Sequence, residues 1–417
     1  MIKQTRKVNP LQVLVLVFFA SAAYGMVLQS IPPLLPAIIG DLNLFHAQGG
    51  LLMSLFALPG IFLSLPGGML ADVYGPKRVG SLSLLLLTTG TLVVGLGKTF
   101  GTLALGRIIA GAGGTAIIII AAQSISLAFM DDRRLGLAMG LFTLSVPTGT
   151  VFSHVVFSRL VLKWGWSMTV MASALICLVI LFFFWKFFHL ETDTNISVES
   201  SREKRPGLLD NFKRGKGYQG VWLLSISWLL YMGAKMALLT FAPEYFSNVG
   251  YDYAFAGLMS GVLSMASIVV APLTGYLLGR TGNAEKYLIF AGITLSASII
   301  LLGTASSGHM PLVIICSIAI AVFPPTVFFI VPMLLPAKNL GQGFGILRIC
   351  ENTGMLLWPA LVGLSYDLSG TYSYGFSIMS ASALGAAVIA ITLIPLMRRF
   401  TAEEKFVGVG ARSREQN

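Results

Sequence analysis

Long apolar runs, separated by short polar junctions, recur along the whole of this 417-residue chain. Their lengths suit the roughly 20 residues that an α-helix needs to cross the hydrocarbon core of a bilayer. The strands of a membrane barrel would be about half as long and would alternate in polarity, which these runs do not. The pattern therefore predicts an all-α membrane protein with many crossings.

Polar or turn-rich junctions divide the chain into twelve predicted transmembrane helices. These helices are expected over residues 11–38, 47–71, 78–97, 101–129, 135–162, 167–188, 219–245, 254–279, 287–306, 310–335, 341–366 and 373–397. A longer polar and charged segment follows the sixth helix and is predicted to be a linker. The expected organisation is an N-terminal six-helix bundle (1–189), a linker (190–217) and a C-terminal six-helix bundle with a tail (218–417).

Composition and charge agree with this assignment. Charged residues make up 11% of the chain, whereas a soluble domain of this length needs a far more charged surface. The net charge of +11 is scattered over successive loops rather than gathered on one face, so we expect no nucleic-acid partner. With the N-terminus inside, 22 of the 28 Lys and Arg residues fall on the cytoplasmic side, as the positive-inside rule requires. We expect cytoplasmic termini, and the short loops suit a bacterial inner membrane.

The two predicted halves repeat one another. Residues 68–75 align with residues 275–282 at an offset of 207, and glycines in the fifth and eleventh predicted helices match at an offset of 205. The matched pairs are Tyr24 and Tyr231, Pro36 and Pro243, Gly136 and Gly341, Gly140 and Gly345, and Gly149 and Gly354. Parallel repeats of this kind are a transporter architecture in which the substrate binds between the halves near mid-membrane.

Two motifs resemble those of the major facilitator superfamily, and the resemblance covers essentially the whole chain. The first is G-x-L-A-D-R-x-G-R-K after the second helix, which here reads "GMLADVYGPK" with Val73 and Pro76 where the family usually carries basic residues. The second is R-x-x-x-G-x-G on the fourth helix, which here reads "RIIAGAG" from Arg107 to Gly113. The resemblance implies two pseudo-symmetric six-helix bundles that work by alternating access.

The resemblance also implies a cytoplasmic gate. Asp72 would engage the other half near the start of the eleventh helix when the cytoplasmic side is closed, and two glycines would allow close approach. The residues expected in this gate are Gly68, Asp72, Gly75, Lys77 and Arg280. The second copy has Gly279 in place of the acid, so we expect an asymmetric gate.

Charged and titratable side chains inside the predicted helices are costly there and usually face a partner or a wet cavity. Arg348 and Glu351 lie three residues apart and form either a structural ion pair or a pair that exchanges partners during transport. Lys235 either pairs across helices, with Glu351 nearest in depth, or meets an anionic substrate. Arg107 either binds substrate or donates hydrogen bonds to neighbouring carbonyls. His154 is either a satisfied buried histidine or a proton-coupling group.

The interiors of the predicted helices hold three basic residues, Arg107, Lys235 and Arg348, and one acid, Glu351. This excess favours an anionic substrate, because fixed positive charge acts strongly in a low-dielectric cavity. The expected substrate-binding residues are Arg107, Lys235, Arg348, Tyr24, Tyr231 and Asn352, although the aromatic rings could serve only in helix packing. Glu351 and His154 are expected to carry or sense a coupled proton.

The sequence thus predicts a monomeric secondary transporter that couples uptake of a small organic or inorganic anion, such as a carboxylate, to protons. No Walker A, HExxH, paired-cysteine or Ser/His/Asp pattern is placed where chemistry could be built, so we expect neither an enzyme nor a cofactor or metal. The aromatic and Met-rich interior leaves open a proton-driven efflux pump for drugs or amphiphiles. A transporter-like receptor, which binds without moving its ligand, is the remaining alternative.

Overall fold

The first half of the chain folds into helices that lie side by side in antiparallel order. The computed structural model describes residues 9–64, 74–129, 134–189, 215–335 and 340–412, and it contains no strand in these ranges. The helices before the linker are α1 (Pro10–Leu28), η1 (Pro32–Leu34), α2 (Leu35–Leu42), α3 (His46–Ser54), α4 (Leu58–Leu63), α6 (Pro76–Leu96), α7 (Phe100–Ala128), α8 (Leu135–Phe152), η2 (Ser153–Phe157) and α9 (Ser158–Phe187).

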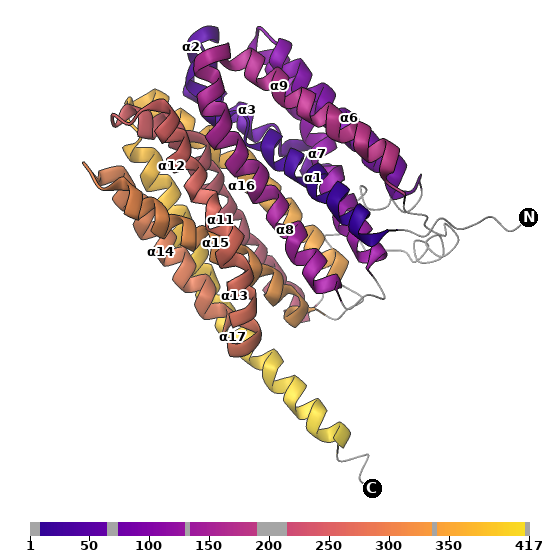
Figure 1. Ribbon diagram of the computed structural model, residues 1–417. Helices are drawn as coiled ribbons and strands as arrows, with labels where there is room; N and C mark the ends of the chain where they lie inside the picture. Colours follow the sequence, from indigo (N-terminus) through magenta and orange to yellow (C-terminus); the bar gives the residue numbers. More distant parts are fainter. Residues whose placement is uncertain (1–8, 65–73, 130–133, 190–214, 336–339, 413–417) are drawn as a thin grey trace, which may run out of the picture.

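The second half forms a similar set beside the first, as Figure 1 shows in salmon to yellow against indigo to magenta. Its helices are α11 (Gly215–Asn248), α12 (Tyr253–Met265), α13 (Ser267–Thr281), α14 (Ala284–Thr304), α15 (His309–Leu334), α16 (Leu340–Ser369) and α17 (Ser373–Arg412). We call the side where α9 ends and α11 begins the linker side. The side where α2 ends and α3 begins is the distal side.

The described helices make twelve crossings, as the sequence predicts. Ten stretches of the described chain are long and apolar enough to span a membrane. One of them, Leu137–Phe187, holds two crossings, because Gly165 interrupts the helix with φ 73° and ψ 171°. Helix α16 has the length of a crossing, with 30 residues, but carries more polar side chains. The exact limits of the predicted linker stay a prediction, since residues 190–214 lie outside the described ranges.

Backbone geometry repeats between the halves and supports the duplication. Left-handed or similar positive-φ conformations recur at matched positions, where glycine or asparagine tolerates them best. The matched pairs are Asn43 (φ 50°) and Gly250 (φ 98°), Gly75 (φ 82°) and Gly282 (φ 64°), and Gly165 (φ 73°) and Gly370 (φ 70°). Their offsets are the 205 and 207 residues found in the sequence, so the same turns end the same helices twice.

Close helix packing also repeats. At Gly149 on α8, an added Cβ would lie 1.9 Å from the Ala22 carbonyl oxygen of α1. At Gly354 on α16, it would lie 2.3 Å from the Leu229 carbonyl oxygen of α11. Small residues let helix backbones approach closely in membranes, where dispersion contacts replace the hydrophobic effect as the packing force. The α1–α8 and α11–α16 contacts are therefore two copies of one interface.

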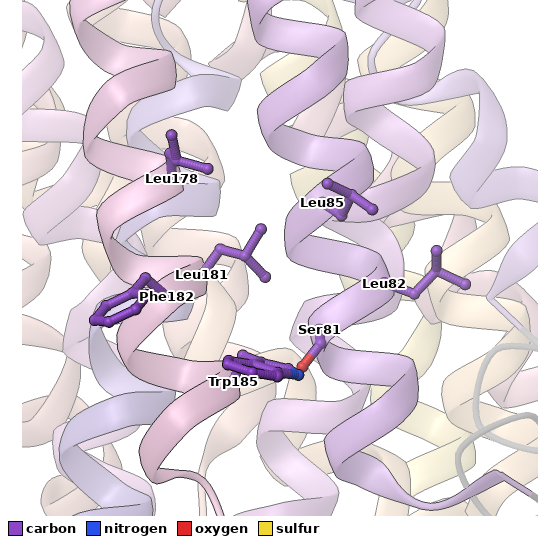
Figure 2. Close-up of a pocket in the computed structure, with 7 residues that line it drawn as sticks. All are labelled: Ser81, Leu82, Leu85, Leu178, Leu181, Phe182 and Trp185. Carbon is purple, nitrogen blue, oxygen red and sulfur yellow. The ribbon is translucent and has the colours of Figure 1, made fainter.

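The outer face of the first half carries an apolar groove between α6 and α9. Figure 2 shows the residues that line it, Leu178, Leu181, Phe182 and Trp185 on one helix and Ser81, Leu82 and Leu85 on the other. Leu82 and Trp185 in its lining are 55% and 61% exposed, as expected for side chains that contact lipid. The groove has a volume of about 390 Å³, and α6 and α9 lie on the side of the first half away from the second half (Figure 1), so it is not part of a path between the halves.

The repeated interface gives a stability prediction. Gly149→Ala should lower the apparent unfolding temperature by several degrees, because overpacking against a backbone costs about 1–3 kcal/mol. The matched control is Gly140→Ala on the same helix, where an added Cβ meets nothing within 4 Å. Thermal unfolding of the purified variants measures both effects. Equal behaviour of the two variants would contradict the close-packed interface.

Candidate functional site

A charged cluster lies in the middle of the second half, on α16 and α11. Arg348 Nη1 donates to both carboxylate oxygens of Glu351, at 3.0 and 3.1 Å. Trp228 Nε1 donates to Glu351 Oε2 at 3.3 Å. The Arg348 side chain is 39% exposed and that of Glu351 is 11% exposed, so the pair borders open space. This confirms the close approach of Arg348 and Glu351, one helical turn apart, that the sequence predicts.

Lys235 contributes a cation that the described structure leaves without a hydrogen bond or ion pair. It follows Trp228 by seven residues on α11, so both side chains lie on one face of the helix. The carboxylate of Glu351 acts on it electrostatically across the gap between α11 and α16. The cluster of Lys235, Arg348, Glu351 and Trp228, which we call the central cluster, thus has two basic groups for one acid.

The first half of the chain closes the central cluster from the opposite side. The phenol of Tyr24 on α1 lies within electrostatic range of Glu351 and Arg348. Asn352 Nδ2 donates to the Arg348 carbonyl at 2.9 Å. Its amide packs against Gly60 of α4, where an added Cβ would lie 2.4 Å from Asn352 Oδ1. Tyr24 and Asn352 therefore sit where the two halves meet.

Arg107 lies elsewhere, in the first half. Its guanidinium is 1% exposed and donates to three carbonyl oxygens: Val27 at 2.8 Å, Leu52 at 2.9 Å and Leu28 at 3.0 Å. These carbonyls belong to the last turns of α1 and α3, where a helix leaves its final carbonyls without intrahelical partners. The guanidinium also stacks 4.5 Å from the Phe56 ring. This geometry favours the structural alternative for Arg107 over contact with a substrate.

Tyr231 is likewise occupied by the fold. Its hydroxyl donates to the Ile320 carbonyl at 2.6 Å, and its ring stacks on Phe323 at 4.2 Å and on Trp228 at 5.2 Å. The residue is fully buried. Tyr231 thus packs against the Trp228 ring, and its hydroxyl is already used in a hydrogen bond to the backbone.

His154 sits on η2, a single π-helical turn that interrupts the fifth crossing. Such turns occur often at functional sites. Its Nε2 lies 3.3 Å from Gln29 Oε1, and Gln29 Nε2 lies 3.3 Å from the sulfur of Met236 in the other half. His154 is fully buried and its Nδ1 has no hydrogen-bond partner in the described structure. His154 thus lies where the two halves meet, through Gln29 and Met236, and is not part of the central cluster.

The predicted cytoplasmic gate is described only in part. Gly68 and Asp72 lie outside the described residues. Gly75 forms the N-cap of α6 with φ 82°, and Lys77 begins that helix with Pro76. Arg280 lies in the last turn of α13, where its guanidinium lies over the Tyr276 ring at 4.7 Å. The gating role of these five residues stays a prediction.

A second group of charged and titratable side chains, which was not predicted from the sequence, lies at the distal ends of the helices. His46 at the start of α3 contacts Glu244 of α11 at 2.9 Å and Asp367 of α16 at 3.1 Å. The three residues are about 200 and 320 positions apart in the chain, so spacing could not bring them together. A weak signal was present, because each is a charged or titratable group at the end of an apolar run. Their contacts close the distal side.

Other contacts between the halves lie toward the distal side as well. Tyr253 on α12 donates to the Pro33 carbonyl at 2.7 Å. An added Cβ at Gly50 would lie 2.1 Å from the Pro359 carbonyl oxygen, which shows how closely α3 and α16 approach. The described structure is therefore a distal-closed state of two bundles around a central charged cluster.

Comparison with known proteins agrees with this architecture. The sequence profile described as the Major Facilitator Superfamily matches residues 17–323. The chain belongs to the major facilitator superfamily. Members of this superfamily and the relatives below are transporters, which confirms the prediction that the chain is a multi-pass membrane transporter and not an enzyme.

Several bacterial transporters are similar along most of this superfamily member. The "Probable nitrate transporter NarT" of Staphylococcus haemolyticus is 27% identical over 84% of this chain and 88% of that protein. The "Probable sulfoacetate transporter SauU" of Cupriavidus necator is 24% identical over 89% of this chain and 90% of that protein. The "Nitrite extrusion protein" of Bacillus subtilis is 24% identical over 91% of this chain and 93% of that protein.

A solved transporter shares the fold. The crystal structure of a bacterial homologue of the human lysosomal transporter Spinster, in an inward-facing and occupied conformation, matches with a TM-score of 0.72. The match covers 94% of this chain and 98% of that chain at 16% identity. The predicted fold of two six-helix bundles is thereby confirmed.

The geometry around Arg107 gives a second prediction. Arg107→Leu should lower the apparent unfolding temperature by several degrees, since each buried carbonyl left without a donor costs about 1–3 kcal/mol. The matched control is Arg159→Leu, because Arg159 is exposed and donates only locally, to the Val155 carbonyl of the adjoining turn η2. Thermal unfolding without any substrate measures the difference. Full stability of Arg107→Leu combined with lost transport would instead support a direct substrate role.

Proposed function

We propose that this transporter takes up a small organic or inorganic anion by alternating access and couples the uptake to protons. The observation that carries the proposal is the central cluster, which holds Lys235 and Arg348 against the single carboxylate of Glu351. Removing a charge from water is expensive unless a partner compensates it. An anion that enters between Lys235 and Arg348 supplies that compensation.

The relatives support the anionic class of the substrate. Their names refer to nitrate, nitrite and sulfoacetate, which differ in size and shape but share negative charge and oxygen acceptors. Arginine and lysine bind such oxygens with charge-assisted hydrogen bonds. Trp228 and Asn352 would form the walls beside the two cations, and Tyr24 would contribute from the first half.

Glu351 is the candidate proton carrier of this mechanism. While ionised, it occupies Arg348 Nη1 with both of its oxygens and competes with any anionic guest. Protonation removes that charge and leaves Arg348 free to bind the anion together with Lys235. Proton and anion then favour each other's binding, which is the linkage that symport requires. His154 is a second candidate, because its Nδ1 is buried and has no hydrogen-bond partner among the described residues.

The orientation follows from the distribution of basic residues. We propose that the linker side is cytoplasmic, because most Lys and Arg residues lie on that side. The distal side then faces outward, and the described state is closed to the outside. The bacterial relatives support a place in the bacterial inner membrane.

Efflux of lipophilic cations has less support. A cation carrier needs an acid that is free to bind the cargo, and the acid of the central cluster is already paired with Arg348. Export of an anion is a second candidate for the direction of transport, because one relative is named a nitrite extrusion protein. The same central cluster would serve either direction.

The substrate site gives a direct test. Lys235→Gln and Arg348→Gln should each reduce uptake into proteoliposomes by roughly 10-fold or more, because a charge-assisted hydrogen bond to the anion is worth about 1.5–3 kcal/mol. Labelled nitrate, nitrite and sulfoacetate are the probes. The matched control is Lys98→Gln in the exposed loop before α7, which should leave uptake unchanged. Undiminished uptake in both site variants would overturn the proposed site.

The coupling role of Glu351 is tested separately. Glu351→Gln keeps the shape of the side chain but cannot bind a proton, so uptake driven by an inward proton gradient should be lost. Counterflow of the anion, which needs no net proton movement, should persist. Glu285→Gln at the start of α14, on the linker side, is the control and should keep both activities. Proton-driven accumulation by Glu351→Gln would contradict the assignment.

A further inference from the structure

The distal contact between the halves includes a helix cap that one half supplies to the other. Helix α3 begins at His46, and its first amide groups have no partners within the helix. Asp367 of α16 accepts from the His46 amide at 2.8 Å and from the Ala47 amide at 2.7 Å. A carboxylate is well placed at the positive end of a helix dipole. The cap therefore forms only while the two halves are together on the distal side.

The His46 imidazole links the same cap to a second acid. Its Nδ1 lies 3.1 Å from Asp367 Oδ1, and its Nε2 lies 2.9 Å from Glu244 Oε1. A neutral imidazole has one donor and one acceptor nitrogen, and an ionised carboxylate only accepts. Two such contacts are thus possible only if the three groups hold one additional proton, either as an imidazolium or on one carboxyl group.

The surroundings keep this proton in place while the distal side is closed. Glu244 is 7% exposed, and the Tyr366 ring covers the imidazole with 4.0 Å between ring centroids. Among the described residues, the charged groups that face His46 are the two carboxylates of α11 and α16. The other titratable groups near them are the phenols of Tyr366, Tyr372 and Tyr253. No described basic side chain forms an ion pair with either acid in place of His46.

We propose that His46, Glu244 and Asp367 form a proton-binding site, which we call the distal proton site, that is filled when the distal side is closed and emptied when it opens. Opening moves α3 away from α11 and α16, which separates the histidine from both acids. The released histidine then titrates as it does in water, with a pKa of about 6.5. The acids lose their shared proton because each faces water again.

The direction of the pH effect follows from this exchange. Since the closed state holds one proton more than the open state, acid favours the closed state. The stabilisation of the closed state by this proton is complete below the pKa of the site in the open state. It decreases as the pH rises and is lost above the pKa of the site in the closed state. The proton enters and leaves on the distal side, so it changes the balance between conformations without being transported. The distal proton site is therefore independent of the proposed substrate and of the coupling role of Glu351.

The opening of the distal side can be measured by a distance between labels. Lys98 and Ser306 lie in exposed distal loops, one in each half, and the native Cys177, Cys316 and Cys350 are buried. Spin labels on K98C and S306C should therefore report the separation of the halves when their distance is measured by double electron–electron resonance in lipid nanodiscs. We expect the ratio of closed to open molecules to rise at least about 5-fold from about pH 8 to about pH 5.5.

Two variants test the proton site itself. In Glu244→Gln, the amide can donate to a neutral His46 while His46 donates to Asp367, so the distal side should stay closed at both pH values. In His46→Gln, both acids lose the shared proton, so the open population should rise and lose its pH dependence. The matched control is His309→Gln, because His309 lies at the distal end of α15 and contacts Tyr251 within the second half.

His309→Gln should keep the pH dependence of the labelled protein that carries no further substitution. If the label distance in the K98C/S306C protein with no further substitution does not change with pH, the proposal is overturned. A Glu244→Gln variant that still opens as the pH rises would overturn it as well, and this outcome remains informative if His46→Gln fails to fold. Neither result would affect the substrate site, which the uptake measurements test.

Discussion

The structure depends on the cost of placing a charged group in the membrane interior, where water cannot solvate it. Arg107 meets this constraint with three carbonyl oxygens, and Arg348 meets it with the carboxylate of Glu351. At the distal side, His46 and two acids compensate one another across the halves. Within the described chain, Lys235 is the intramembrane cation that has no such partner. The proposed substrate site lies where this compensation is missing.

Alternating access also requires that some contacts break while others persist. The glycine contacts at Gly149 and Gly354 lie inside each half, where α1 packs on α8 and α11 packs on α16. These glycines bring the helix backbones within each half into direct contact. The contacts between the halves include close glycine packing as well, as at Gly50 against Pro359. They also include the hydrogen bonds and ion pairs of His46, which a change in protonation or hydration can release. Polar contacts that a change in protonation can release thus lie between the two bundles.

Much of this architecture could be predicted from the sequence, because helix length, loop charge and the 205- and 207-residue offsets are local or periodic signals. The pairing of Arg348 with Glu351 was also predictable, since the two lie one turn apart on a helix. The role of Arg107 could not be decided, because the carbonyls of residues 27, 28 and 52 carry no signature in the sequence. The distal proton site was missed for a similar reason, as its members come from three helices far apart in the chain.

We propose that the uncompensated positive charge between the halves selects an anion. Ligand binding to the folded state raises its apparent stability. The most direct measurement is therefore thermal unfolding of the purified protein with nitrate, nitrite, sulfoacetate or a lipophilic cation at matched ionic strength. We expect a saturable rise in unfolding temperature with at least one of the anions and none with the cation. Saturable stabilisation by the cation and by none of the anions would contradict the proposal.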